Sequence, residues 1–533
     1  MRKIAISLLF AIAIIGIYGC SETTTTTGTT IATTTTIPIT TQTTGTTQAT
    51  TIPATTTVVT TAPTTLAASD TEEPTTTLTG LALAIEQLAN PLNLALFITD
   101  DPTTKMGFNF ELPTDEAGYV EIAAEGTQTY IRHEAESKSR AIGNRTVHLR
   151  SLTIDQLTPG ETYSYRVTNA DNSIASDYHQ FTLPTTEATE FTFMFLPDPQ
   201  ETWDYGYRIY AANIISVLEY AKTNYDFVVV PGDIINDADV RSQWNWFFRY
   251  SSVYSFTKPL AATSGNHDVS GFNRTSIQAM EYDGYLNLPT NGPAYEEFTE
   301  LADDLRQGNF DNGKTYSFDY GNAHFVMINT EMFCDGTTAC PAFDTVNATI
   351  LENWLKADLA ANAKPWSIIV LHRGPYSSSY DTVSVRNRLA PIFDEYGVDL
   401  VLAGHDHQYS RAVYADGELI EFDIADTPAF GEVLLAEESG SGRNLNLYAS
   451  VLGTTYLTGN TTGTKFYGST RSSGISVNYK FAGEYPVISM ITVMPTGIEV
   501  KSYAVVKATN LTLEPSSIVL LERFTILKEH PET

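Results

Sequence analysis

The chain has 533 residues, of which 42% are hydrophobic, and this is enough to form two or three folded domains with large cores. Its 62 acidic residues outnumber its 31 Lys and Arg residues, so the formal net charge at pH 7 is −31. A surface that binds nucleic acid or anionic lipid needs a basic face to neutralise phosphates. The composition therefore argues against a general nucleic-acid or anionic-membrane surface and indicates an acidic bulk surface.

The first 20 residues have the layout of an export signal. Met1, Arg2 and Lys3 precede an apolar run that is too short to span a membrane comfortably, and Cys20 closes this run. A Cys in this place resembles a bacterial lipobox, which implies an exported lipoprotein anchored to the membrane through Cys20, at the cell surface or facing the periplasm. Tyr18 departs from the small residue usual two places before the Cys, so a plain signal peptide or an uncleaved anchor is the alternative.

Residues 21–80 form a Thr-rich stretch with scattered Pro, Gly, Ala and Ile. Such a composition cannot bury enough apolar surface to offset the conformational entropy of the chain. We expect a disordered linker that acts as a spacer, and the alternative is a neutral low-complexity insertion.

Residues 81–187 contain short alternating segments separated by turn residues, which predict a small all-β domain. The predicted strands are 94–98, 106–110, 119–123, 146–149 and 163–167. The stretch from Leu157 to Val167 resembles the late strand pair of a fibronectin type III domain. We expect this domain to have a packing and positioning role.

Residues 188–510 change to buried apolar strands that alternate with helical stretches, and this pattern predicts an α/β domain. The expected strands are 191–196, 227–230, 260–263, 323–328, 367–371 and 400–402, and the expected helices include 209–222, 348–360 and 385–396. Segments 445–451, 487–493 and 499–505 are expected to complete the second sheet, and 511–533 is a tail. The aromatic run 244–250 has helical spacing, which favours a core face over a substrate platform.

Residues of metal-ligand type follow five of these strands. The segments are Asp198-Pro-Gln200, Gly232-Asp233, Gly265-Asn266-His267-Asp268, His372-Arg373 and Gly404-His405-Asp406-His407. Ligands of open α/β sheets bind at the carboxyl ends of strands, so these residues can converge on one site although they are spread over about 200 positions.

This ordered set resembles the calcineurin-like metallophosphoesterase superfamily, and the preceding β-domain and the run from Gly404 to Arg411 resemble its purple acid phosphatase branch. The resemblance implies a β-sandwich of two mixed sheets flanked by helices. It also implies two transition-metal ions of Fe, Zn or Mn type: Asp198 and His407 would bind the first, Asn266, His372 and His405 the second, and Asp233 would bridge them.

The resemblance further implies hydrolysis of phosphate esters by a metal-bridged hydroxide, with His267 protonating the leaving oxygen. Asp268, Arg373 and Arg411 complete the candidate catalytic residues, although Arg on such loops is as often structural. Two positions depart from the family pattern. Gln200 stands where superfamily members often have a His ligand, and Asn236 stands where purple acid phosphatases have the Tyr that gives the purple colour, so we expect no such colour.

Cys334 and Cys340 are the Cys residues that remain after Cys20. Their spacing in an exported protein predicts a disulfide that closes a local loop, and two free thiols are the alternative.

For the function, the leading hypothesis is a phosphate monoesterase. A phosphodiesterase or nucleotidase with the same centre is the second, and a surface binding protein on a decayed enzyme scaffold is the third.

Overall fold

The computed structural model describes residues 78–127, 129–142, 145–269, 280–293, 314–333, 345–420, 447–450, 453–467, 472–481 and 483–528. Residues 1–77, which include the first 20 residues and nearly all of the Thr-rich segment, lie outside these ranges, as do the Cys334–Cys340 loop and most of the segment from 270 to 313. The predicted linker therefore ends earlier than expected, because helix α1 begins at Leu78. Within the described part, no helix is both long enough and apolar enough to cross a membrane.

The N-terminal part begins with α1 (Leu78–Glu86) and continues as strands that pair mostly antiparallel. These strands are β1 (Ala95–Phe97), β2 (Met106–Leu112), β3 (Gly118–Ala124), β4 (Ile131–Ser137), β5 (Arg140–Ile142), β6 (Arg145–Ile154), β7 (Thr162–Asn169) and β8 (His179–Thr182). The five predicted strands are present, and β4, β5 and β8 were not predicted. Phe108, Tyr165 and Phe181 pack edge to face or tilted in a separate small core.

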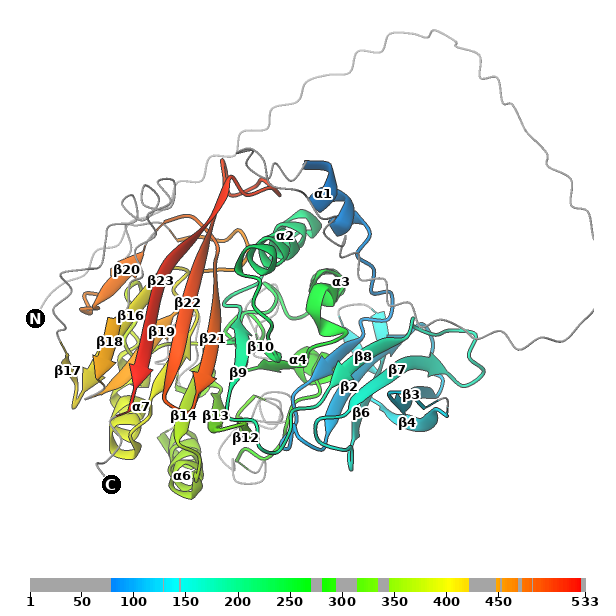
Figure 1. Ribbon diagram of the computed structural model, residues 1–533, viewed down its shortest axis with the longest axis horizontal. Coiled ribbons are helices and arrows are strands. Elements are labelled where there is room, and N and C mark those ends of the chain that lie inside the picture. The colour runs from blue at the N-terminus through cyan, green and yellow to red at the C-terminus, as the bar shows by residue number, and fades with distance from the viewer. Residues whose placement is uncertain are drawn as a thin grey trace, which may run out of the picture. The chain divides into compact units, whose positions relative to one another are not determined.

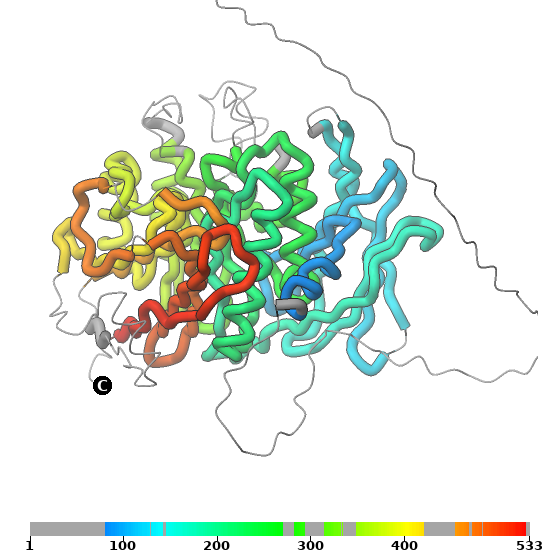
Figure 2. Tube along the Cα trace, turned by 90° about the horizontal axis from the view of Figure 1, so that it is seen from above, coloured from blue at the N-terminus to red at the C-terminus, as the bar shows by residue number. Residues whose placement is uncertain are grey.

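The N-terminal strands continue directly into the first sheet of the α/β part (Figure 1). β1 pairs in parallel with β11 (Leu260–Ala262) and antiparallel with β2, so it joins the two regions. Among the described residues this sheet has 15 strands, in the order β18-β23-β22-β21-β9-β10-β11-β1-β2-β6-β4-β3-β7-β8, with β5 beside β6. Seen from above, the blue and cyan N-terminal strands lie on one side of the green segment and the red strands lie on the other (Figure 2).

The α/β part of this first sheet is formed by β9 (Phe191–Phe195), β10 (Phe227–Val230) and β11, followed in space by the late strands. The late strands are β18 (Leu447–Ser450), β21 (Val487–Met494), β22 (Gly497–Val506) and β23 (Ser517–Leu527). The sequence indicated three of these four segments but assigned them to the second sheet. That assignment is wrong, because β21 pairs antiparallel with β9 and so joins the late strands to the first sheet.

The second sheet has eight strands among the described residues, in the order β12-β13-β14-β15-β19-β16-β17, with β20 beside β16. Their bounds are β12 (Tyr316–Tyr320), β13 (Ala323–Ile328), β14 (Trp366–Leu371), β15 (Leu400–Ala403), β16 (Tyr409–Ala415), β17 (Glu418–Leu419), β19 (Thr454–Thr458) and β20 (Tyr479–Phe481). β13, β14, β15 and β19 run parallel.

The two sheets pack face to face, and helices cover their outer faces. Phe325 of β13 meets Phe193 of β9 edge to face at 5.4 Å between ring centroids. Its neighbour Val326 points to the opposite face, into a second core with α6 (Thr345–Ala361) and α7 (Val383–Tyr396). This alternation is what a strand buried on both faces requires. The predicted layers, two mixed sheets flanked by helices, are confirmed.

The helices α2 (Asp204–Ala221) and α3 (Arg241–Ser255) cover the first sheet, with the short α4 (Met280–Tyr285) beside them. Buried residues of α2 recur at Tyr207, Tyr210, Ala211, Ile214 and Val217, which is the spacing of one helix face. The aromatic run of α3 is a core face as expected, because Trp244 is fully buried and stacks on Tyr285 at 4.7 Å.

A candidate two-metal centre

Strand ends from both sheets supply the candidate site. Asp198, Asp233 and Asn266 follow β9, β10 and β11 of the first sheet, while His372 and His405 follow β14 and β15 of the second. In the second sheet Leu371 pairs with Ala403, so the chain leaves both strands at the same level and His372 and His405 come together. The structure thus brings the residues predicted to bind metal to one place.

The backbone at these strand ends is strained. Asp198, Asp233, His405 and His407 have φ values of 44°, 52°, 70° and 48°, a region that non-Gly residues rarely occupy. Such strain persists only where surrounding contacts hold it, and it concentrates at functional sites. Adjacent glycines allow the close packing, because a Cβ at Gly404 would overlap the carboxylate of Asp198 and one at Gly265 would overlap that of Asp233.

Four potential ligand atoms converge around His372. Its Nε2 atom lies 3.1 Å from Asn266 Oδ1, 3.2 Å from His405 Nδ1 and 3.3 Å from Asp233 Oδ2. Ligand atoms about 2.1 Å from a zinc-type ion are roughly 3.0 Å apart in an octahedron and roughly 3.4 Å apart in a tetrahedron. Imidazole, carboxylate and amide oxygen are also the donor types that suit Zn, Fe and Mn. These four residues therefore fit the second metal ion.

Burial and charge make this cluster a strong attractor for cations. Asp198, Asp233 and His372 lie within 4.8 Å of one another and are buried. Burial and the neighbouring Asp233 raise the pKa of Asp198 to about 7. Burial alone would lower the pKa of His372, but Asp233 and Asp198 outweigh it and raise the pKa to about 9. Both shifts show that positive charge is favoured between the two carboxylates.

The residues predicted to bind the first metal ion are arranged differently from those around His372. His407 Nε2 lies 3.6 Å from Asp198 Oδ1. Gln200 is fully buried beside them, and its Nε2 lies 2.7 Å from Asp233 Oδ2 and 3.2 Å from His407 Nε2. Gln200 is therefore within the cluster, but as a hydrogen-bond partner of residues predicted to be ligands.

Lys465 is a residue of the site that the sequence analysis missed. Its Nζ lies 2.8 Å from Gln200 Oε1, 3.3 Å from Asn236 Oδ1 and 3.0 Å from His267 Nε2. It follows β19 and lies outside any motif. Recognition of β19 as a strand of the second sheet would have been the one sequence signal that pointed to the loop containing Lys465. Tyr380, which lies between β14 and α7, and Tyr467, which follows β19, were also missed. Their rings lie 4.7 Å from that of His405 and 4.3 Å from that of His407, respectively.

The next two residues of the Gly-Asn-His-Asp segment have distinct places. His267 Nδ1 lies 2.7 Å from the Asn236 carbonyl oxygen, and its backbone N–H donates to Asp233 Oδ1 at 2.8 Å. Asp268 accepts hydrogen bonds from the backbone N–H groups of Ile234, Ile235 and Gly265. Asp268 thereby ties the loop after β10 to the loop after β11, which is a positioning role.

The two arginines predicted as catalytic candidates occupy different environments. Arg373 Nη1 lies 2.9 Å from His405 Nε2, at the edge of the metal cluster. Arg411 instead pairs with buried Glu522 through two contacts of 2.9 Å each, and Tyr409 donates to the same carboxylate. The structure thus places Arg411 in a structural ion pair between the sheets, and we do not assign it a contact with substrate.

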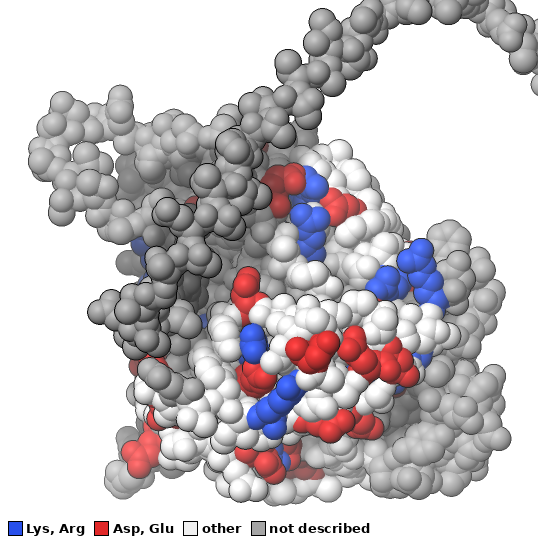
Figure 3. Space-filling model, turned by 90° about the vertical axis from the view of Figure 1, so that its right-hand side faces the viewer, with Lys and Arg blue, Asp and Glu red and all other residues white. Residues whose placement is uncertain are grey.

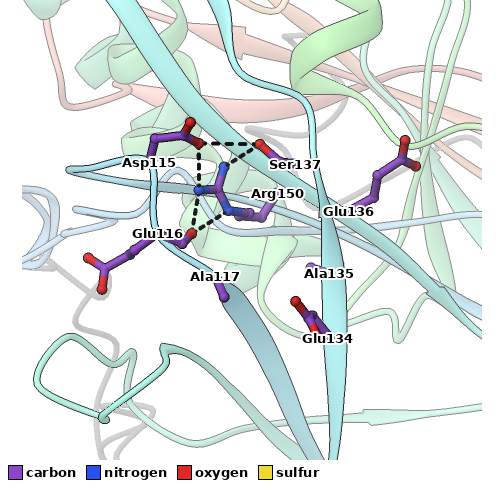
Figure 4. A pocket seen from close by; sticks show the side chains of 8 residues that line it. All are labelled: Asp115, Glu116, Ala117, Glu134, Ala135, Glu136, Ser137 and Arg150. Carbon is purple, nitrogen blue, oxygen red and sulfur yellow. Dashed lines mark hydrogen bonds and ion pairs between the residues drawn. The ribbon is translucent and has the colours of Figure 1, made fainter.

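A cavity of about 560 Å³ lies elsewhere, in the N-terminal part (Figure 4). Its lining includes Asp115, Glu116, Glu134 and Glu136, and the buried Arg150 is held by Asp115 and by the backbone oxygen of Glu116. The excess of carboxylates disfavours a phosphate ester there.

Figure 3 shows the face turned to the right of Figure 1, where acidic and basic side chains of the described residues are interspersed.

Comparisons with known proteins agree with this geometry. Residues 174–409 match the family model for calcineurin-like phosphoesterases, and residues 91–183 match the model for the purple acid phosphatase N-terminal domain. Residues 174–409 are thus similar to calcineurin-like phosphoesterases, and the segment before them is similar to the N-terminal domain of purple acid phosphatases. The first of these matched segments contains every residue predicted here to bind metal, and it ends before Lys465.

The individual proteins to which the chain is similar include acid phosphatases and purple acid phosphatases. The chain is 28% identical to an acid phosphatase of Aspergillus ficuum, over 32% of this chain and 36% of that protein. It is 25% identical to purple acid phosphatase 21 of Arabidopsis thaliana, over 36% of this chain and 39% of that protein. The matched segments thus span well under half the length of these curated relatives.

The fold of the chain is similar to that of a solved purple acid phosphatase. The structure of PPD1 from yellow lupin (Lupinus luteus) seeds superposes with a TM-score of 0.57 at 16% sequence identity. The superposition covers 83% of this chain and 76% of the lupin chain. It therefore includes both the N-terminal strands and the α/β part.

Proposed function

We propose that this chain is an exported, metal-dependent phosphatase that hydrolyses phosphate monoesters at a binuclear centre. The observation that carries the proposal is the convergence of Asp233, Asn266 and His405 on Nε2 of His372, with 3.1 to 3.3 Å between the ligand atoms. The relatives named acid phosphatase and purple acid phosphatase support the same reaction.

The chain offers two groups of ligands for the metal ions. Asn266, His372 and His405 would hold one ion, Asp198 and His407 would hold the other, and Asp233 would contact both. When bound, the ions supply positive charge that stabilises the phosphoryl oxygens and lower the pKa of a nucleophilic water. We propose Fe, Zn or Mn for these positions because the donors are oxygen and imidazole nitrogen.

In this proposal Arg373 binds the phosphoryl group. If His405 binds metal through Nδ1, its Nε2 carries the ring proton and can no longer accept a hydrogen bond from Arg373. The guanidinium can then exchange this contact for one with a phosphoryl oxygen, while Glu331 keeps it in position through contacts of 2.7 and 3.0 Å. His267 lies beside Asn236, with 2.7 Å between its Nδ1 and the carbonyl oxygen of that residue, and in this proposal its protonated imidazole supplies the proton that the leaving oxygen requires.

The test is hydrolysis of p-nitrophenyl phosphate and of bis(p-nitrophenyl) phosphate by the purified chain, together with its metal content, before and after chelation. We expect chelator-sensitive hydrolysis of the monoester that returns with added metal, and its loss in His372→Ala. The control His133→Ala changes a histidine of β4 far from the cluster in sequence and should retain activity. Hydrolysis of the diester alone would favour the phosphodiesterase alternative. Full activity of His372→Ala would refute the site.

A surface binding protein on a decayed scaffold is the second candidate function. Gln200 and Asn236, which replace a histidine and a tyrosine of related proteins, favour it. The metal-content and hydrolysis measurements on the purified chain distinguish the two functions. A chain that binds no metal and shows no hydrolysis after metal is added back supports the binding protein, whereas turnover excludes it.

Export and membrane anchoring through Cys20 form a separate part of the proposal. They rest on the N-terminal sequence pattern. The test is expression of the full chain in a bacterial host, followed by detergent phase partitioning of the wild type and Cys20→Ser. Partitioning of the wild type into detergent, and of the variant into water, is expected. Identical partitioning of both proteins would contradict lipidation at Cys20.

A further inference from the structure

We propose that Lys465 and Gln200 act as a pair that weakens metal binding on the Asp198 and His407 side, so that the centre has one tight and one weak metal position. This inference rests on the proposed metal centre. It concerns residues that the family resemblance does not provide, since Gln200 departs from the superfamily pattern and Lys465 lies beyond the matched segment.

Hydrogen-bond chemistry fixes the orientation of the Gln200 amide. A lysine ammonium only donates, so the atom of Gln200 that lies 2.8 Å from Lys465 Nζ must be the amide oxygen. His407 confirms this orientation, because its Nδ1 contacts the backbone oxygen of Lys465 and must donate to it. The other ring nitrogen of His407, Nε2, is then an acceptor, and it faces the Gln200 amide nitrogen at 3.2 Å.

The amide nitrogen of Gln200 therefore points at the predicted ligand atoms of the first metal. Its two N–H groups are directed at Asp233 Oδ2, 2.7 Å away, and at His407 Nε2. An amide nitrogen has no lone pair available for a metal ion, so Gln200 donates to ligand atoms where a histidine would itself be a ligand. A cation that binds here must displace both hydrogen bonds. Among the described residues, its ligands on this side would be Asp198, Asp233 and His407.

Charge acts in the same direction. The Lys465 ammonium contacts both positions where the family pattern places metal ligands, Gln200 and Asn236. Like charges at such separations in a partly buried site repel by enough to change a metal affinity tenfold or more.

The test is calorimetric titration of the metal-free full chain with Zn²⁺, repeated with Mn²⁺. We expect two binding phases whose dissociation constants differ roughly tenfold or more. Lys465→Met should tighten the weaker phase by roughly tenfold and leave the tighter phase within about threefold, and Gln200→His should act similarly by adding a ligand. Asn266→Ala should weaken the tighter phase instead.

Lys507→Met is the matched control, because Lys507 is also a buried lysine but binds the backbone oxygens of Thr512 and Leu513. It should change neither phase. Two equal phases in the wild type, or an unchanged weak phase in both Lys465→Met and Gln200→His, would overturn the inference while leaving a metal-dependent phosphatase intact. A protein that binds no metal would overturn both this inference and the proposed function. Circular dichroism of each variant verifies that it is folded, and Gln200→His keeps the test decisive if Lys465→Met does not fold.

Discussion

The guanidinium of Arg373 and the carboxylate of Glu331 form a two-point ion pair, with Nε 2.7 Å from Oε1 and Nη2 3.0 Å from Oε2. Glu331 lies in the 3-10 helix η2 (Thr330–Phe333), directly after β13, and Arg373 follows the neighbouring strand β14. The pair leaves Nη1 directed at the His405 ring. A fork of this kind is specific to arginine, because the ammonium of a lysine has no planar pair of donors.

Arg373→Met is expected to lower kcat/KM for p-nitrophenyl phosphate by roughly 10²-fold, because a charged donor to the phosphoryl group is lost. Its metal content should stay that of the wild type. Arg373→Lys should restore little activity, and Glu331→Gln should produce a smaller loss of the same kind. Steady-state kinetics and elemental analysis on the same samples test this. Loss of metal in proportion to activity would mean that Arg373 supports the cluster and not the substrate.

Arg411→Met is expected to destabilise the fold, because it leaves Glu522 buried without its cation. Side-chain exposure is 5% for Arg411 and 0% for Glu522, and breaking such a pair costs roughly 3–5 kcal/mol. Urea unfolding followed by fluorescence measures this loss. The double variant Arg411→Met, Glu522→Gln should regain part of it. Folded Arg411→Met should retain near-normal kcat/KM, and a large selective loss of activity in a stable variant would instead support a catalytic Arg411.

Gly404→Ala is expected to weaken metal binding by roughly 10–100-fold, because the added methyl group overlaps the carboxylate of Asp198. Calorimetric titration with Zn²⁺ measures the affinity. Gly80→Ala is a suitable control, since a Cβ at Gly80 meets nothing within 4 Å. Unchanged affinity in Gly404→Ala would show that Asp198 can move without cost and is not a tightly positioned ligand.

His324 is expected to make stability depend on pH, because it lies between Asp319 at 2.8 Å and Asp358 at 2.9 Å. Burial lowers its pKa, but the two carboxylates outweigh this effect and raise the pKa from 6.5 to about 9. The charged form is thus favoured in the folded state. Its contribution to stability is fully present below pH 6.5 and is lost as the pH rises through 9.

The corresponding experiment compares the unfolding free energies of the wild type and His324→Gln. The wild type should exceed the variant by roughly 2 kcal/mol at pH 6, after allowance for the exposure of Asp319, and the difference should shrink as the pH rises past 9. A difference that stays constant across this range would show that His324 acts through packing alone.

Local patterns were sufficient to predict most of the α/β part and the members of the metal cluster. The strands β9, β10, β13, β14 and β15 are buried on both faces, so each appears in the sequence as an unbroken apolar run. An Asp or His follows four of these runs, and Asn266 follows the neighbouring strand β11. This change from apolar to polar residues is visible without a structure. β4 was missed because its exposed residues show no apolar alternation.

Only the tertiary structure decided how these ligands are surrounded. Which sheet the late strands join depends on pairing between β9 and β21, nearly 300 positions apart, and no local pattern encodes such a partner. The role of Arg411 likewise depended on Glu522, and the orientation of Gln200 depended on Lys465, more than 260 residues away along the chain. The sequence by itself determined which residue types stand at the strand ends, because burial and strand geometry act over a few residues. The long-range contacts between loops determined which of those residues face a metal, a substrate or each other.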